Sequence, residues 1–215
     1  MWTAMFYRSL MFRQVLVLKK RVFLSKYFAL MKALKIILYV LGGILLLLLL
    51  LGLIAPVNLE VEDSIKIEAP RDLVFEQTVH FPNFHHWSPW THRDPDMEVT
   101  YGGNQGEVGA TYRWEGIEEV GSGMQEIVSI SGDTVNVALR FYEPFESEAK
   151  AYYIISKLES NPPLTRVSWG MQSTFPRPFN IVAWLGNFER KIGEEYREGL
   201  SSLKERVAEV EADEG

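Results

Sequence analysis

The hydrophobic pattern divides this chain into one apolar run and a longer region of alternating residues. The run, residues 36–55, reads IILYVLGGILLLLLLLGLIA and contains neither a charge nor a proline. As a helix that rises about 1.5 Å per residue it is roughly 30 Å long, which matches the hydrocarbon thickness of a bilayer. A buried helix of a soluble domain is usually shorter and carries some polar residue. The run therefore predicts a transmembrane helix.

From residue 59 onward, apolar and polar residues alternate as they do in half-buried strands. Val61, Ile65 and Ile67 define the first strand. Pro70 then begins a short helix, and the prolines of the aromatic segment 80–90 (HFPNFHHWSPW) prevent a long one. Strands that follow one another closely pair mostly antiparallel. Six further strands are predicted between turn signals, at residues 97–101, 111–115, 123–131, 135–141, 149–158 and 165–172.

The last part of the chain has the period of an amphipathic helix. Its apolar residues fall on one stripe, and Glu, Lys and Arg fill the opposite face. The pattern predicts one long helix that closes the domain. The stripe consists of Val182, Leu185, Phe188, Ile192, Tyr196, Leu200, Leu203, Val207 and Val210.

Four segments follow from these patterns. We expect a basic N-terminal segment at residues 1–35, the span at 36–55, a folded domain at 59–207 and an acidic tail at 208–215. The domain is expected to fold without the span, because its own strands and helix bury one another. For residues 1–30 two interpretations stay open: a basic amphipathic segment on the inner leaflet, or an upstream start before Met31.

The distribution of charge indicates how the chain is oriented. Residues 1–59 contain eight of the 22 basic residues and no acidic one, whereas residues 60–215 contain 14 basic and 28 acidic residues. Basic residues that flank a span stay in the cytoplasm, so we expect a cytoplasmic N-terminus and an extracytoplasmic domain in the cell membrane. A cleaved signal peptide is the rival interpretation, but the run is longer than a signal core and Ala55-Pro56-Val57 is a poor cleavage site. The acidic domain excludes a nucleic-acid partner.

The chemistry available to the chain is restricted. It has no cysteine, and therefore no disulfide, no thiolate nucleophile and no sulfur-ligated zinc site. Four histidines lie near the aromatic segment, but adjacent side chains such as His85 and His86 normally point apart. We interpret His80, His85, His86 and His92 as structural, and expect neither a metal nor a cofactor.

The order of these elements resembles that of the START-like, or helix-grip, fold. The residues resemble the polyketide cyclase/dehydrase-like branch of that superfamily, the SRPBCC proteins. The resemblance rests on IKIEAPRDLVFEQTVHFPNFHHWSPW (65–90), YRWEG (112–116), TRVSWGM (165–171) and IGEEYREGLSSLK (192–204). It implies an α+β domain in which an antiparallel sheet wraps around a long C-terminal helix.

The resemblance also implies a function, since the superfamily includes lipid carriers, hormone receptors and cyclases. The leading hypothesis is a membrane-anchored, monomeric domain that binds a hydrophobic small molecule or lipid. The alternatives are a polyketide cyclase- or dehydratase-like enzyme and a structural interaction domain without a ligand. The anchor is a departure from the soluble cyclases.

A cavity between sheet and helix is the expected ligand site. Large side chains there would line an apolar pocket with a few polar groups, although a filled core is the alternative. Catalytic residues stay unknown, because strand residues such as Arg113, Glu115, Glu126, Arg140 and Tyr153 form no set of nucleophile, base and orienting group. The cavity candidates are Trp87, Trp90, Tyr112, Trp114, Trp169, Met171 and Trp184.

Overall fold

The computed structural model describes residues 30–214, which divide between Ile54 and Ala55 into two units. In the first unit a helix runs from Leu30 to Ile54 and starts six residues before the predicted span; a window of 18 residues within it has a mean hydropathy of 3.0. By length and composition it can cross a membrane, and a signal sequence near an N-terminus meets the same criterion. The basic segment expected at residues 1–35 lies mostly outside the described residues.

The second unit contains a seven-stranded antiparallel sheet in the order β1-β7-β6-β5-β4-β3-β2. Each of the six later strands begins and ends within two residues of its predicted range. All neighbouring strands of the sheet pair antiparallel, as predicted. The strands are β1 (Asn58–Ile67), β2 (Glu98–Gly102), β3 (Thr111–Glu115), β4 (Ser122–Ser131), β5 (Thr134–Glu143), β6 (Ser147–Leu158) and β7 (Leu164–Thr174).

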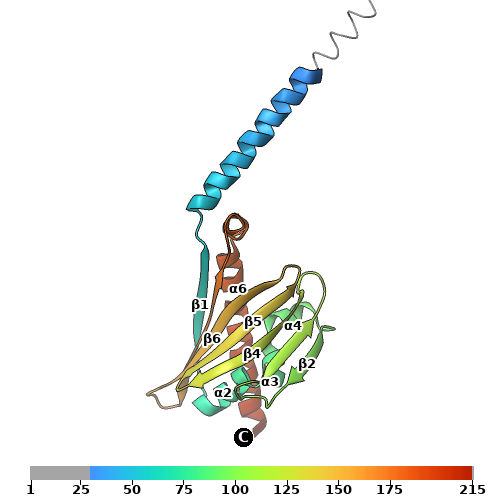
Figure 1. The fold of residues 1–215 in the computed structure, drawn as a ribbon. Helices are drawn as coiled ribbons and strands as arrows, with labels where there is room; N and C mark the ends of the chain where they lie inside the picture. The colour runs from blue at the N-terminus through green and yellow to red at the C-terminus, as the bar shows by residue number, and fades with distance from the viewer. Residues whose placement is uncertain (1–29, 215) are drawn as a thin grey trace, which may run out of the picture. The chain divides into compact units, whose positions relative to one another are not determined.

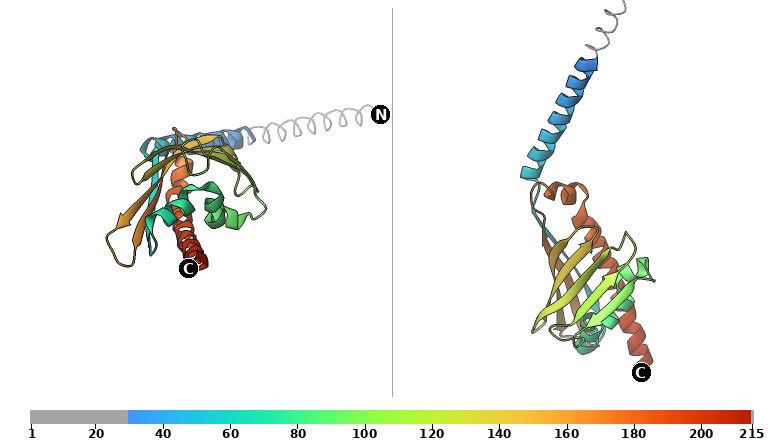
Figure 2. Two further views of the ribbon diagram at one scale, coloured as in Figure 1. Left: turned by 90° about the horizontal axis from the view of Figure 1, so that it is seen from below. Right: turned by 45° about the vertical axis from the view of Figure 1, so that its right-hand side comes forward.

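The sheet curves around one long helix (Figures 1 and 2), and the short helices α2, α3, α4 and α5 pack beside that helix. Inward-facing strand residues such as Val135, Val137 and Ile155 alternate with polar residues on the outer face, which is why this sheet has one buried side. The helices are α2 (Arg71–Val79), α3 (Phe81–Trp87), α4 (Pro89–Arg93), α5 (Asn180–Leu185) and α6 (Phe188–Glu214).

The prediction of a single C-terminal helix is wrong at its N-terminal end. The helix ends at Leu185, and α6 begins after Asn187, whose φ of 54° lies in the left-handed region that breaks a helix. Val182 and Leu185 were assigned to the buried stripe but are 58% and 64% exposed. Tyr196, Leu200, Leu203 and Val207 are buried as predicted, and Phe188 and Ile192 pack, half-buried, against the same core. Helix α6 continues through the predicted tail to Glu214.

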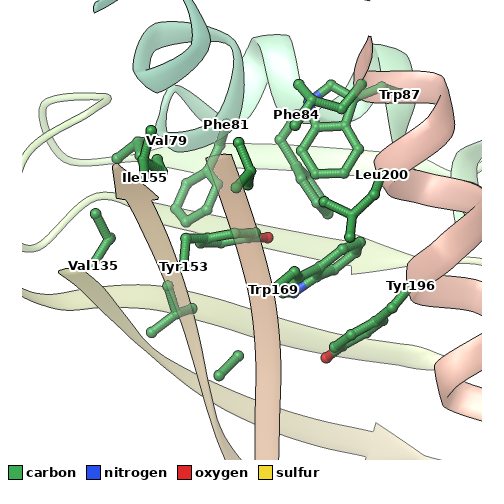
Figure 3. Packing of buried hydrophobic residues seen from close by; sticks show 14 of the residues in the cluster. Val79, Phe81, Phe84, Trp87, Val135, Tyr153, Ile155, Trp169, Tyr196 and Leu200 are labelled. Atoms are coloured by element: carbon green, nitrogen blue, oxygen red, sulfur yellow. The ribbon is translucent and has the colours of Figure 1, made fainter. Parts of the chain in front are cut away.

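Trp169 is the centre of the core. Its ring stacks on Tyr196 of α6, with centroids 4.0 Å apart and an interplanar angle of 8°, and Tyr153 lies 5.5 Å away (Figure 3). A Cβ atom at Gly199 would lie 2.8 Å from the Trp169 ring, so this glycine allows α6 to approach the sheet closely. The edges of three more rings face Trp169, those of Phe84, Trp87 and Trp90.

Candidate functional site

A cavity of about 190 Å³ lies between the inner face of the sheet, α3, α4 and α6. Its wall is mostly aromatic and aliphatic. The sheet contributes Tyr112, Trp114, Gln125, Leu139, Phe141 and Met171; the helices and loops contribute Phe84, Ser88, Trp90, Met97, Val120, Ile192, Glu195 and Tyr196.

The register of the strands brings the sheet residues together. Tyr112 on β3 is opposite Gln125 on β4, which is opposite Leu139 on β5, so these three side chains form one row on the inner face. In the next row Trp114 is opposite Gly123. A Cβ atom at Gly123 would come within 2.5 Å of the Trp114 ring, so the indole lies flat against β4 because that position is a glycine.

Two polar side chains in the wall make no hydrogen bond to any other described residue. The Gln125 side chain is buried, with a residue exposure of 6%, and its amide has no partner among residues 30–214; the same holds for the Ser88 hydroxyl. Neither side chain belongs to the fully buried polar groups that lack a partner, so the polar ends of both face the open space of the cavity. The amide is therefore available to a polar group of a bound molecule.

Tyr112 is held by a hydrogen bond behind the cavity wall. Its hydroxyl lies 3.2 Å from Nδ1 of His85, and Thr91 Oγ1 lies 3.4 Å from the same nitrogen. Burial, together with the charge of neighbouring His86, lowers the pKa of His85, so this imidazole is mainly neutral at pH 7. Burial raises the pKa of Tyr112, which keeps its hydroxyl protonated.

A charged pair borders the cavity on the side of α6. Arg93 Nη1 of α4 lies 2.6 Å from Glu195 Oε1, and Nη2 lies 3.9 Å from Glu198. The pair joins α4 to α6, and the charge of Arg93 balances that of Glu195, the one carboxylate of the described cavity wall. It gives an otherwise apolar site one polar edge.

The structure brings four of the seven predicted cavity residues together: Trp90, Tyr112, Trp114 and Met171 line the cavity. Trp87 and Trp169 belong to the core instead, at 1% and 2% exposure, because other rings enclose them. Trp184 is 46% exposed on α5 and lines a separate depression of about 60 Å³ with Pro56 and Phe188.

The strand residues considered for catalysis do not meet at the cavity. Arg140 lies on the outer face, 3.8 Å from both Glu126 and Glu148, and Arg113 lies over the Tyr142 ring at 5.1 Å. Glu115 is exposed. Tyr153 points inward but packs on Trp169 in the core. Among the described residues, no three His, Asp or Glu side chains form a group that could hold a metal ion.

Sequence reasoning missed Gln125, although a signal was present. Gln125 stands between Gly123 and Ile127 on the alternation of β4, at a position where an apolar residue is expected. Leu139 of β5 and Ser88, Met97 and Glu195 from the loops and helices were also missed, because which of them faces space depends on contacts between distant elements.

A larger depression of about 580 Å³ lies over β1, β5, β6 and β7. Exposed polar side chains such as Lys150 and Gln172 form much of its wall, and Gln172 donates a hydrogen bond to Glu60 there. An apolar molecule would bury little of its own surface in this open site. The smaller cavity is therefore the better candidate.

No family model matches the chain, and no curated protein matches it. Solved structures do. Protein XoxI from Bacillus cereus has a TM-score of 0.52 and 13% identity, over 71% of this chain and 98% of the other. Ara h 8.0201 has a TM-score of 0.50 and 11% identity over 71% and 99%, and TTHA0849 from Thermus thermophilus has 0.50 and 15% over 70% and 98%. At such identities the likeness concerns the fold: the second unit has the α+β helix-grip fold of START-like proteins, as the sequence predicted.

Proposed function

We propose that this protein is a membrane-anchored START-like domain that binds a small hydrophobic molecule in the 190 Å³ cavity. The observation that carries the proposal is an apolar cavity whose wall contains an amide without a partner. A cavity of roughly 150 Å³ can hold benzene, whereas pockets for drug-sized ligands measure about 300–1,000 Å³. We therefore infer a ligand of one or two rings, or a short acyl segment, rather than an entire phospholipid.

The polar groups narrow the class of ligand further. Gln125 offers both a donor and an acceptor, and Ser88 offers a hydroxyl. A carbonyl or hydroxyl group on the ligand would form a hydrogen bond with the amide that no described residue provides. The ligand is thus a mainly apolar molecule with at least one such group.

The alternative of an enzyme has one contact in its favour, the hydrogen bond between Tyr112 and His85. A neutral histidine beside a cavity could take a proton. However, burial raises the pKa of Tyr112, and the hydroxyl is already directed at His85, so the pair is better suited to orienting a ring than to moving a proton. The alternative of a filled structural core has less support, because the cavity is present.

A variant that fills the cavity tests the proposal. We expect Leu139→Trp to place an indole in the space and to exclude the ligand. The protein is purified in lipid nanodiscs, extracted with organic solvent and analysed by mass spectrometry. A compound that is enriched at least tenfold in the parent over the variant is the cavity ligand, since bilayer lipids occur equally in both extracts.

Val128→Trp is the matched control, because Val128 is 47% exposed on the adjacent strand β4. It should retain the compound. Gln125→Leu should lose it by about tenfold without a fall in the free energy of unfolding, because an unpaired polar group is replaced by an apolar one of similar shape. If the extracts of parent and Leu139→Trp are identical, the binding proposal fails.

The proposed anchor is the helix Leu30–Ile54, which is about 37 Å long at 1.5 Å per residue and begins with the basic residues Lys32 and Lys35. We expect a reporter enzyme that is active only outside the cytoplasm to work when it is fused after Gly215. A fluorescent protein that folds only in the cytoplasm serves as the control at the same position. A silent reporter together with a fluorescent control would show that the domain lies in the cytoplasm, the opposite of the proposed topology. Release of a shortened, soluble product would instead identify residues 30–54 as a cleaved signal.

A further inference from the structure

Exposed apolar side chains gather on α5 and the residue before it. Phe179, Val182 and Leu185 are 65%, 58% and 64% exposed, and Trp184 is 46% exposed. We call these four residues the α5 patch. Two of them belong to the stripe that the helical period assigned to the core, so their exposure needs an explanation. Contiguous exposed apolar side chains mark an interaction surface.

The α5 patch is joined to the residues that directly follow the apolar helix. Asn180 Nδ2 donates a 2.8 Å hydrogen bond to the carbonyl oxygen of Ala55, and the backbone N–H of Phe175 donates one of 2.8 Å to Val57. Consecutive Cα atoms are about 3.8 Å apart, so Ala55 is within one such step of Ile54, where the apolar helix ends. These bonds keep α5 close to Ala55, the residue that follows the apolar helix.

The two ends of the sheet also differ in how many apolar side chains they expose. At the end where β1 begins, Phe145 in the β5–β6 turn is 80% exposed and Ile117 in the β3–β4 loop is 51% exposed. At the opposite end, the turns at residues 132–133 and 159–163 contain no large apolar residue. Val108, 59% exposed, lies in the loop between β2 and β3 at that end. Exposed apolar side chains are thus concentrated at the end of the sheet where β1 begins.

We propose that the α5 patch is a membrane-contacting surface, whose apolar side chains enter the interfacial layer of the bilayer that holds the anchor. The inference rests on the membrane anchoring proposed above. Short amphipathic helices bind at this layer by burying one apolar face, and tryptophan is enriched there. The bilayer is the expected partner because the α5 patch is linked to the proposed anchor, both through the covalent chain and through the Asn180 bond to Ala55.

Because the chain has no cysteine, a single introduced cysteine gives one labelling point. Val182→Cys and Val108→Cys form a matched pair, since both valines are exposed to almost the same extent, 58% and 59%. Leu47→Cys in the apolar helix reports on the anchor. Each full-length variant is reconstituted into phosphatidylcholine vesicles and carries an environment-sensitive fluorophore. Quenching is measured with a nitroxide on the acyl chains and with iodide in the water.

We expect the label at residue 182 to be quenched several-fold more by the lipid nitroxide than the label at residue 108, and to be protected from iodide. Strong quenching by iodide at residue 182, together with lipid quenching at residue 47, would show that the α5 patch does not contact the bilayer although the apolar helix is inserted in it. Protection at residue 182 from both quenchers would also overturn it, in favour of a protein partner such as a second copy. The absence of lipid quenching at residue 47 would show instead that the anchoring fails, and with it the inference.

Discussion

Trp169→Ala is expected to lower the free energy of unfolding by roughly 3–5 kcal/mol, the range for a large aromatic side chain removed from a packed core. Trp169 contacts five other rings, including the stack on Tyr196, and Gly199 leaves no slack between helix and sheet. A void would therefore open that α6 can close only by shifting. Thermal and denaturant unfolding of the full chain would measure the loss.

Two other tryptophans make this test specific. Trp184→Ala removes an exposed side chain and should change the free energy of unfolding by about 0.5 kcal/mol or less. Trp114→Ala removes part of the cavity wall, where one side of the ring already faces space. It should therefore lower the free energy of unfolding less than Trp169→Ala does, and reduce ligand binding more. Equal destabilisation by Trp114→Ala and Trp169→Ala, with no ligand in the parent, would mean that the core is filled at both positions.

A second large effect is expected at alkaline pH. Burial raises the pKa of Tyr153 and Tyr196, and it raises that of Tyr112 as well. The folded state therefore keeps protons that the unfolded state releases above pH 10 or so. The stabilisation is complete below that pH and falls, as the pH rises toward the folded pKa values, by about 1.4 kcal/mol per pH unit for each tyrosine.

Three such groups together lower stability by about 4 kcal/mol per pH unit, which is large beside a typical total of about 5–15 kcal/mol. Cooperative unfolding should follow by about pH 12, as observed by circular dichroism and tyrosinate absorbance. Tyr196→Phe keeps the stacked ring and should reduce the slope by one tyrosine, as should Tyr153→Phe, and the double variant should reduce it by two. A slope unchanged in all three would show that these hydroxyls ionise freely in the folded protein.

The sequence predicted the sheet because its signals are local. Alternation assigned Tyr112, Trp114 and Trp169 to the inner face, and their places in the cavity wall and in the core confirm it. Alternation cannot tell a core position from a cavity wall, because that difference depends on rings supplied by α3, α4 and α6. For Trp169 the deciding residue is Gly199, thirty positions later in the chain.

The break between α5 and α6 was predictable in principle. Gly186 and Asn187 form a common helix-stop signal, but the apolar period continues across them and was given more weight. The error is informative, since an apolar period can be satisfied by a membrane as well as by a core. Val182 and Leu185 follow the period of α6 without sharing its environment.

The connection between the apolar helix and β1 sets the reach of the domain. Only Ala55, Pro56 and Val57 separate Ile54 from Asn58, so the first strand can begin no more than about 15 Å from the end of the helix. With the membrane anchoring proposed above, a domain on so short a connection cannot travel across a compartment to deliver a ligand. Any molecule it binds must come to it, either by lateral diffusion within the bilayer or with a soluble carrier. Under the proposed function, ligand exchange would therefore be limited by the arrival and departure of the ligand rather than by movement of the protein.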